Sequence, residues 1–327
     1  MAISGDVFRI NQVYELLQEG QWPLEYRKNY YGWFSGSSGQ QSTVDRIDFA
    51  SDTGTASVRG PLSIGRNLFA GTGNENYGWF GGGFNSSLTP NTTVIIDRID
   101  FAADTDTALV RSSLSVGKFR HTATTDNNYG WFVGGANLLS SPLSLIDRII
   151  FSSDTSTATA RGLLSSRRYG LSSFENNTYG WFGGGRDSSI PGSFSYIDRM
   201  TFTSDTLTTS SRGPLSAGRY QMSGVNNENY GWFGGGTPGH FSTVDRVDFA
   251  DDTSITSVRG TLSVGKHQHG SVSNNDYGWF VGGVSNPPLI SGTSLIDRID
   301  FSADTNTAEV RGTLSYGRRG IDGVSNF

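Results

Sequence analysis

The stretch Asn76-Tyr77-Gly78-Trp79-Phe80-Gly81-Gly82-Gly83 decides the fold, because its centre recurs along the chain. Tyr-Gly-Trp-Phe occurs six times, beginning at Tyr31, Tyr77, Tyr129, Tyr179, Tyr230 and Tyr277. An Asp-Arg dipeptide follows every copy, at Asp45, Asp97, Asp147, Asp198, Asp245 and Asp297. A further arginine comes later in each unit, at Arg59, Arg111, Arg161, Arg212, Arg259 and Arg311. Self-similarity with a period of about 50 residues indicates a repeat architecture.

The spacings between these motifs show which parts of the repeat are constant. From each Asp-Arg to the later arginine the count is always 14 residues, and from that arginine to the next tyrosine it is always 18. From tyrosine to Asp-Arg it varies between 14 and 20. All length variation therefore falls in one segment per unit, just after the glycines. A fixed scaffold with one variable loop per unit is typical of repeat proteins.

Each unit predicts four β-strands, labelled a to d here. In the second unit the predicted strands are Asn67–Thr72, Tyr77–Gly81, Ile95–Ala102 and Ala108–Arg111. Between the last two lies a turn, residues 104–107, in which an Asp side chain is expected to accept backbone N–H groups. Four short strands in about 50 residues predict a β-propeller blade of the kelch kind.

The two ends of the chain predict how the ring closes. The first unit starts directly at strand b, with nothing that resembles strand a before Tyr30. Residues 319–327 are in register with the strand a region of the other units. We therefore predict an all-β, six-bladed propeller over residues 30–327, with blade one completed by the C-terminal strand. Closure of this kind leaves few strand edges exposed.

Composition excludes several classes of protein. The chain has 327 residues, 44 glycines, no cysteine and a formal net charge of −5. Without cysteine there are no disulfides and no thiolate metal sites. The mild acidity is not the electrostatic footprint of a nucleic-acid-binding protein. No run reaches the roughly 18 apolar residues of a membrane span, and no basic and apolar leader suggests a signal peptide.

Residues 1–29 do not match the repeat and predict a partly helical N-terminal segment. Asp6 is suited to cap a helix, and Gly20 to end it. The apolar positions follow helical spacing, at Val7, Ile10, Val13, Leu16 and Leu17. Such a stripe must be buried somewhere. Two interpretations stay open: the helix lies against the rim of the propeller, or it attaches the chain to another protein.

The repeat resembles the kelch motif over nearly all of residues 30–327. Its pattern is Asn-x-Tyr-Gly-Trp-Phe-Gly-Gly, then Asp-Arg-x-x-Phe, Asp-Thr and Leu-Ser-x-Gly-Arg. The glycine doublets match at Gly82-Gly83, Gly134-Gly135, Gly184-Gly185, Gly235-Gly236 and Gly282-Gly283. The closing basic residues match at Arg66, Lys118, Arg168, Arg219, Lys266 and Arg318. The chain departs from the motif in strand d, where kelch repeats carry a tryptophan and this chain has Val58-Arg59 or its equivalents.

The near-identical copies of Tyr-Gly-Trp-Phe-Gly-Gly-Gly and Val-Asp-Arg-Ile-Asp-Phe also resemble kelch-like structural proteins of marine bacteriophages, particularly phages of cyanobacteria. This resemblance implies a virion protein, made in the host cytoplasm, of the tail-fibre, tail-accessory or capsid-decoration type. It implies other virion proteins as partners of residues 1–29, and a host-surface glycan or protein as a possible ligand of the propeller.

The charged motifs predict structure rather than catalysis. Asp-Arg recurs in every unit at fixed spacing, whereas an active site breaks such symmetry, so we predict a buried structural pair. The turn around Asp52 is similar to the Asp-boxes of sialidases, which are structural too. Among the histidines, alternation places His267 and His269 on one strand face, where a surface pair is expected. No catalytic residue, metal site or cofactor is predicted.

The variable loops supply the candidate ligand-binding residues. In an antiparallel blade the b–c and d–a connections lie on one face, so these loops are presented together, at Ser35–Thr43, Gly83–Thr93, Ala136–Ser144, Arg186–Ser195, Thr237–Ser242 and Val284–Ser294. The candidate contact residues in them are Phe84, Leu138, Phe194, His240 and Phe241. Loops on a rigid scaffold commonly carry function.

Three functions follow. The first is a non-enzymatic virion protein that presents the propeller for binding, and repeated strand chemistry with variable loops favours it. The alternative is a propeller that binds or processes glycans, like a sialidase, and arginines and acids in the central funnel of only some blades would favour it. The third is a cellular kelch scaffold, which would be expected to carry an accessory domain.

Overall fold

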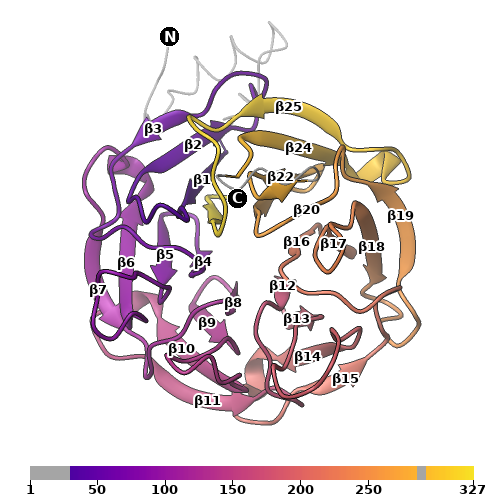
Figure 1. Ribbon diagram of the computed structural model, residues 1–327, viewed down its shortest axis with the longest axis horizontal. Coiled ribbons are helices and arrows are strands. Elements are labelled where there is room, and N and C mark those ends of the chain that lie inside the picture. Colours follow the sequence, from indigo (N-terminus) through magenta and orange to yellow (C-terminus); the bar gives the residue numbers. More distant parts are fainter. Residues whose placement is uncertain (1–29, 286–291) are drawn as a thin grey trace, which may run out of the picture.

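The computed structural model describes residues 30–285 and 292–327, which form six four-stranded antiparallel sheets arranged radially in a ring (Figure 1). The prediction of an all-β, six-bladed propeller is confirmed. Each sheet runs from an inner strand beside the central channel to an outer strand at the rim.

The strands repeat in the same order in every blade. The inner strands are β4 (Ala70–Gly73), β8 (Thr122–Thr125), β12 (Ser172–Glu175), β16 (Ser223–Asn226), β21 (Gly270–Ser273) and β26 (Asp322–Ser325). The second strands are β1 (Tyr31–Ser35), β5 (Tyr77–Gly81), β9 (Tyr129–Val133), β13 (Tyr179–Gly183), β17 (Tyr230–Gly234) and β22 (Tyr277–Val281). The third strands are β2 (Val44–Asp48), β6 (Ile95–Asp100), β10 (Leu145–Ile150), β14 (Ile197–Thr201), β18 (Thr243–Asp248) and β24 (Leu295–Asp300).

The outer strands are β3 (Ser57–Arg59), β7 (Leu109–Ser113), β11 (Thr159–Leu163), β15 (Ser210–Arg212), β19 (Ser257–Thr261) and β25 (Glu309–Thr313). Four short 3₁₀ helices follow third strands, namely η1 (Phe101–Ala103), η2 (Phe151–Ser153), η3 (Phe202–Ser204) and η4 (Phe301–Ala303). A small separate pair, β20 (Lys266–His267) and β23 (Val284–Ser285), lies on the sixth blade.

The predicted strand boundaries are right for strand b and wrong by a few residues elsewhere. In the second blade the inner strand begins at Ala70, three residues later than predicted. The residues before Ala70 instead belong to the segment that crosses from the first blade to the second. In this segment Asn67 forms an antiparallel β-bridge with Phe84. The third strand ends at Asp100, because the side chain of Asp100 accepts a hydrogen bond from Ala102 N at 2.9 Å and starts η1.

The predicted ring closure is confirmed. The C-terminal strand β26 pairs antiparallel with β1, so that Trp33 lies opposite Val324. The side chain of Asn326 also accepts a hydrogen bond from Tyr31 N at 2.8 Å. In Figure 1 the C-terminus lies on the inner side of the ring, beside β1. Blade one therefore takes its inner strand from one end of the chain and its other three from the opposite end.

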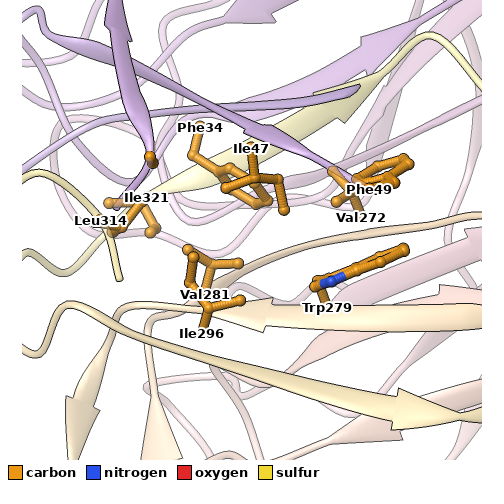
Figure 2. Packing of buried hydrophobic residues seen from close by; sticks show 10 residues of the cluster. Phe34, Ile47, Phe49, Val272, Trp279, Val281, Ile296, Leu314 and Ile321 are labelled. Atoms are coloured by element: carbon orange, nitrogen blue, oxygen red, sulfur yellow. The ribbon is translucent and has the colours of Figure 1, made fainter. Parts of the chain in front are cut away.

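The core lies between blades rather than within them. Successive side chains of a strand point to opposite faces, and both Trp79 and Phe80 are fully buried because a neighbour covers each face of the blade. Each tryptophan stacks on the phenylalanine that follows the third strand of the next blade, as Trp79 does on Phe151 with ring centroids 4.0 Å apart. Figure 2 shows the same packing across the closure, where Trp279 stacks on Phe49. Aromatic stacking thus joins the first and last blades as it joins the others.

In five of the six blades a glycine doublet turns the second strand toward the neighbouring blade. Gly82 and Gly83 have φ of +68° and +107°, which glycine adopts at little steric cost. Gly83 N donates to the carbonyl of Lys118 in the next blade at 2.8 Å. A Cβ at Gly83 would lie 2.8 Å from the carbonyl oxygen of Asn67. The doublet therefore sets each variable loop close against the inter-blade crossings.

Candidate binding face

The aspartates of the Asp-Arg dipeptides form buried ion pairs with the closing basic residues. The pairs are Asp45–Arg318, Asp97–Arg66, Asp147–Lys118, Asp198–Arg168, Asp245–Arg219 and Asp297–Lys266, with N–O distances of 2.8 to 3.2 Å. Every one of these side chains has zero exposure. Burial lowers the pKa of Lys118, and the charge of Asp147 opposes that effect. These pairs hold the crossing segments onto the second and third strands.

The arginines of the same dipeptides belong to a second network between blades. Each reaches the aspartate that follows the third strand of the next blade. That aspartate also accepts a hydrogen bond from a tryptophan and forms an ion pair with a second arginine. Asp205, for example, accepts from Trp131 Nε1 at 2.9 Å, Arg148 at 3.0 Å and Arg161 Nε at 2.9 Å. Burial opposes ionisation, but the hydrogen bonds from Arg161 and Trp131 lower the pKa of Asp205 below its ordinary value.

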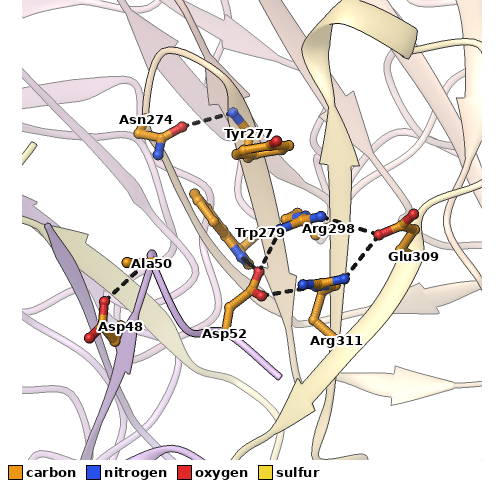
Figure 3. Close-up of polar contacts among 9 residues, drawn as sticks. All are labelled: Asp48, Ala50, Asp52, Asn274, Tyr277, Trp279, Arg298, Glu309 and Arg311. Atoms are coloured by element: carbon orange, nitrogen blue, oxygen red, sulfur yellow. Dashed lines mark hydrogen bonds and ion pairs between the residues drawn. The ribbon is translucent and has the colours of Figure 1, made fainter. Parts of the chain in front are cut away.

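Figure 3 shows this network where the ring closes, with Asp52 contacting Trp279, Arg298 and Arg311. The predicted role of these turn aspartates as acceptors of backbone N–H groups is therefore wrong. Their side chains bond the preceding blade, and in η1 and η4 the backbone N–H groups are capped by an earlier aspartate, Asp100 or Asp300.

The prediction of Asp-Arg as a pair needs a correction. Asp147 and Arg148 have different partners, Lys118 in their own blade and Asp205 in the next. The reason is geometric: adjacent residues of a strand point to opposite faces, so they cannot share one buried site. Arg148 is also partly exposed, at 19% of its side chain, whereas Asp147 is fully buried. Each repeated charge thus has a partner in the scaffold.

The variable loops and the crossing segments lie at the same end of the ring. In each of four blades a bridge joins the start of the loop to the crossing, at Asn67–Phe84, Phe119–Ala136, Tyr169–Arg186 and Tyr220–Thr237. In the sixth blade β20 and β23 make the equivalent contact. We call this end the loop face.

Of the predicted contact residues, only Leu138 is exposed, at 48%, beside Leu139 at 81%. Phe84 packs against Phe119 with centroids 5.8 Å apart, and Phe194 stacks on Tyr196 at 4.8 Å. These two rings are half-buried and fill space beneath the loops.

The other two predicted contact residues also pack against neighbours. The ring of Phe241 lies 5.7 Å from the guanidinium of Arg219. His240 meets His267 edge-on, with centroids 4.8 Å apart. The predicted attachment residues Val7, Ile10, Val13, Leu16 and Leu17 lie outside the described residues.

A closed ring of backbone hydrogen bonds surrounds the mouth of the channel on the loop face. One residue per blade contributes, and each N–H donates to the carbonyl of the residue in the neighbouring blade at 2.6 to 2.9 Å. The members are Leu68, Arg120, Gly170, Gln221, Gln268 and Gly320, all with φ between +55° and +68°. The backbone is uniform around the mouth, so the side chains alone differ from blade to blade.

Two arginines, Arg120 of this hydrogen-bonded ring and Arg186 of a variable loop, lie among aromatic side chains. The guanidinium carbon of Arg120 is 5.6 Å from the ring centre of Tyr169, and that of Arg186 is 5.7 Å from Tyr220. The two tyrosine rings meet edge-on at 6.4 Å. Burial lowers the pKa of Arg120, and the neighbouring charge of Arg186 lowers it further. Sequence reasoning missed this cluster, although both arginines occupy positions that carry no charge in most other units.

Two carboxyl groups line the channel below the mouth. Asp322, at the start of β26, accepts hydrogen bonds from the backbone N–H groups of Gly71 and Gly323, both at 2.9 Å. Glu175, at the end of β12, accepts from Thr124 Oγ1 at 2.8 Å. Burial raises the pKa of each carboxyl to about 7. Neither residue is repeated in the other inner strands.

The histidines do not form the expected surface pair. His269 is only 4% exposed and packs on Phe280, with centroids 5.7 Å apart. Burial, His240 and Arg319 together lower the pKa of His267 to about 4. Within residues 30–285 and 292–327, no three His, Asp or Glu side chains are grouped as metal ligands. In the same part of the chain, no helix is long and apolar enough to span a membrane.

Comparison with known proteins defines the class of this chain as a six-bladed β-propeller and assigns it to no family. No known family and no curated protein matches the sequence. Among solved structures, 505 chains are similar, which makes the fold a common one that does not single out a function. One is described as the structure of YjhT, with a TM-score of 0.68 and 12% sequence identity. The alignment covers 86% of this chain and 94% of that one. Propellers of this kind serve in binding or in catalysis.

Proposed function

We propose that the chain is a non-enzymatic binding propeller that takes its ligand at the loop face, around the mouth of the channel. One observation carries the proposal. The repeated charged residues are satisfied by the scaffold, and the basic residues that form no ion pair within residues 30–285 and 292–327 lie in the loops and crossings of this face. A rigid ring that varies only in its side chains and loops at one end is built to present those groups.

We further propose that the protein belongs to a phage virion, as a tail-fibre, tail-accessory or capsid-decoration protein. The support is the resemblance of the repeats to structural proteins of marine bacteriophages. In this proposal residues 1–29 attach to another virion protein, and the loop face contacts a glycan or protein of the host surface. Deleting residues 1–21 is expected to leave a folded, soluble propeller that no longer assembles onto particles. If the truncated protein assembles normally, or fails to fold, the assignment of attachment to residues 1–29 and of ligand binding to the propeller is wrong.

The chain has no cysteine, so either face can be blocked selectively. Leu139→Cys places a thiol on the loop face, at a side chain that is 81% exposed. Glu228→Cys places one on the opposite face, in an exposed hairpin between inner and second strands. Full-length variants carrying a polyethylene glycol maleimide are applied to a glycan array and to host cells. We expect loss of binding for the first variant and none for the second. The reverse pattern contradicts a binding role for the loop face.

A second function, glycan processing, is favoured by one observation. Glu175 and Asp322 are unrepeated channel carboxyls that stay partly protonated near neutral pH, and a carboxylic acid with a raised pKa is what a glycosidase uses as general acid. They stand on β12 and β26, in the fourth and first blades, and each accepts a hydrogen bond from the inner strand of a neighbouring blade, Glu175 from Thr124 and Asp322 from Gly71 N. Release of sugar from a panel of fluorogenic glycosides, abolished by Glu175→Gln, would establish the enzyme instead of the binder.

A further inference from the structure

The basic residues of the scaffold can be sorted by whether a carboxylate neutralises them. Within residues 30–285 and 292–327, every lysine and arginine but three forms an ion pair. The exceptions are Arg120, Arg186 and Arg319, and all three lie in the crossings or loops of the loop face. The nearest acid in sequence, Asp187, is bound to Arg167 at 2.9 Å and does not neutralise Arg186. No carboxylate in the described part of the chain therefore neutralises the positive charge of these three arginines.

Two of these arginines are held together. The backbone of Arg186 bonds Tyr169 in both directions, at 2.9 and 3.0 Å. The backbone of Arg120 belongs to the ring and accepts from Gly170 N at 2.7 Å. Tyr169 and Gly170 are consecutive, so both arginines are anchored to the same crossing. The Nε atoms of Arg120 and Arg186 are buried and have no hydrogen-bond partner in the described part of the chain, as is also true of ion-paired arginines such as Arg66 and Arg219. What sets Arg120 and Arg186 apart is that they have no carboxylate partner either.

This arrangement is costly without a ligand. Two like charges close together repel each other, and a buried N–H donor without an acceptor loses the hydrogen bond that water would provide. An anion between the two guanidinium groups would remove the repulsion and accept from both. Guanidinium groups favour carboxylate and phosphate, because their paired N–H donors match two oxygens.

One ring beside the arginines indicates the rest of the ligand. Tyr220 is half-buried next to Arg186, and an aromatic ring at a partly open surface can stack on the apolar side of a sugar. Phe119 and Tyr169 are buried, each at 8% exposure, and contact the guanidinium of Arg120. We propose that Arg120 and Arg186, with Tyr220 beside them, form a binding site for the oxyanion of an acidic saccharide, a carboxylate or a phosphate on a sugar. The inference rests on the proposed function and names the chemical class of its ligand.

The test uses the full-length protein and three probes of similar size: glucuronate, glucose 6-phosphate and neutral glucose. Titration calorimetry or tyrosine and tryptophan fluorescence gives the dissociation constants. One charge-assisted contact is worth enough that we expect at least about tenfold tighter binding of an acidic probe than of glucose. The two acidic probes distinguish a carboxylate site from a phosphate site. Binding of the acidic probes should weaken as salt is raised.

Variants assign the effect to this pair. Arg120→Gln and Arg186→Gln should each weaken binding of the acidic probe by about tenfold or more, since each removes a charged donor. Arg319→Gln is the matched control, equally unpaired but placed in the first blade beside His267, and should change binding by less than about twofold. Because none of the three forms an ion pair, no variant should melt below the natural chain, and Arg120→Gln and Arg186→Gln should melt at the same temperature or slightly higher, since each relieves the repulsion between the two arginines.

Several results overturn the proposal. They are no saturation by either acidic probe up to about 10 mM, equal affinity for glucose, or an equal loss of affinity in Arg319→Gln. If one of the two arginine variants fails to fold, the other variant and the salt dependence of binding still test the proposal. If the acidic probes fail while blocking Leu139→Cys still abolishes array or cell binding, the loop face remains the binding site and only the acidic ligand is wrong.

Discussion

The buried ion pairs allow a matched comparison, because the basic partner is lysine in some blades and arginine in others. Asp147 faces Lys118 Nζ at 3.2 Å and accepts from Ser115 Oγ at 2.6 Å. Asp97 occupies the same place in the second blade and faces Arg66 at 2.8 Å. Asp147→Ala and Asp97→Ala each remove the carboxylate and leave a fully buried cation.

The expected cost follows from what that cation can do. Breaking a buried pair by removing one partner costs about 3–5 kcal/mol. Lys118 can avoid the cost of an unpaired buried charge, because it can lose its proton. Neutralising a lysine of ordinary pKa at pH 7 costs about 4–5 kcal/mol, which caps the penalty for Asp147→Ala. Arg66 remains charged at any accessible pH, so Asp97→Ala has no such cap and should destabilise the protein at least as much.

The pH dependence separates the two variants. In Asp147→Ala the folded chain holds a neutral Lys118, whereas the unfolded chain keeps that lysine protonated up to a pH of about 10.4. The unfolded state therefore binds more protons, and the stability of this variant should rise with pH by about 1.4 kcal/mol per unit, relative to the natural chain, between pH 7 and 9.5. Asp97→Ala should show no such slope.

The assay is denaturant unfolding, followed by the fluorescence of the buried tryptophans. Asp106→Ala, at an exposed turn residue, serves as the control for aspartate removal. Adding Lys118→Met to Asp147→Ala should recover stability, because an apolar side chain leaves no unpaired charge in the buried site. A flat profile for Asp147→Ala, or a rescue by Arg148→Met in its place, would refute the partner assignment.

Two further predictions follow from the ring and its channel. Deleting residues 319–327 removes β26 from the first blade and should lower the melting temperature sharply, and an unchanged value would contradict ring closure. Because burial raises the pKa of Glu175 to about 7, the folded state retains a proton that the unfolded state has lost above a pH of about 4.3, so the stability of the natural chain should fall as pH rises through that window. Glu175→Gln should therefore melt higher than the natural chain at pH 8 but not at pH 4, and equal melting temperatures at pH 8 would show that Glu175 ionises normally.

The sequence by itself determined the number of blades, their order and the closure. These depend on local, repeated information: an aromatic strand beginning at each tyrosine, glycines after it, and constant spacing to the next unit. Residues 319–327 could be assigned to the first blade because the register of the repeat continues to the end of the chain. The second strand, with its residues from Tyr77 to Gly81, was located without error for the same reason.

The tertiary structure decided which residues meet. Asp147 and Arg148 are neighbours in sequence, yet the pleat sends them to different faces and different partners, which spacing alone does not show. Phe84 and Phe194 lie in loops but pack beneath them, because burial depends on what the adjacent crossing supplies. Arg120 and Arg186 are far apart in the chain and come together only because the crossing at Tyr169 anchors both. Contacts between blades are long-range, so the repeat pattern specifies the scaffold, while the groups at its mouth are assembled by the fold.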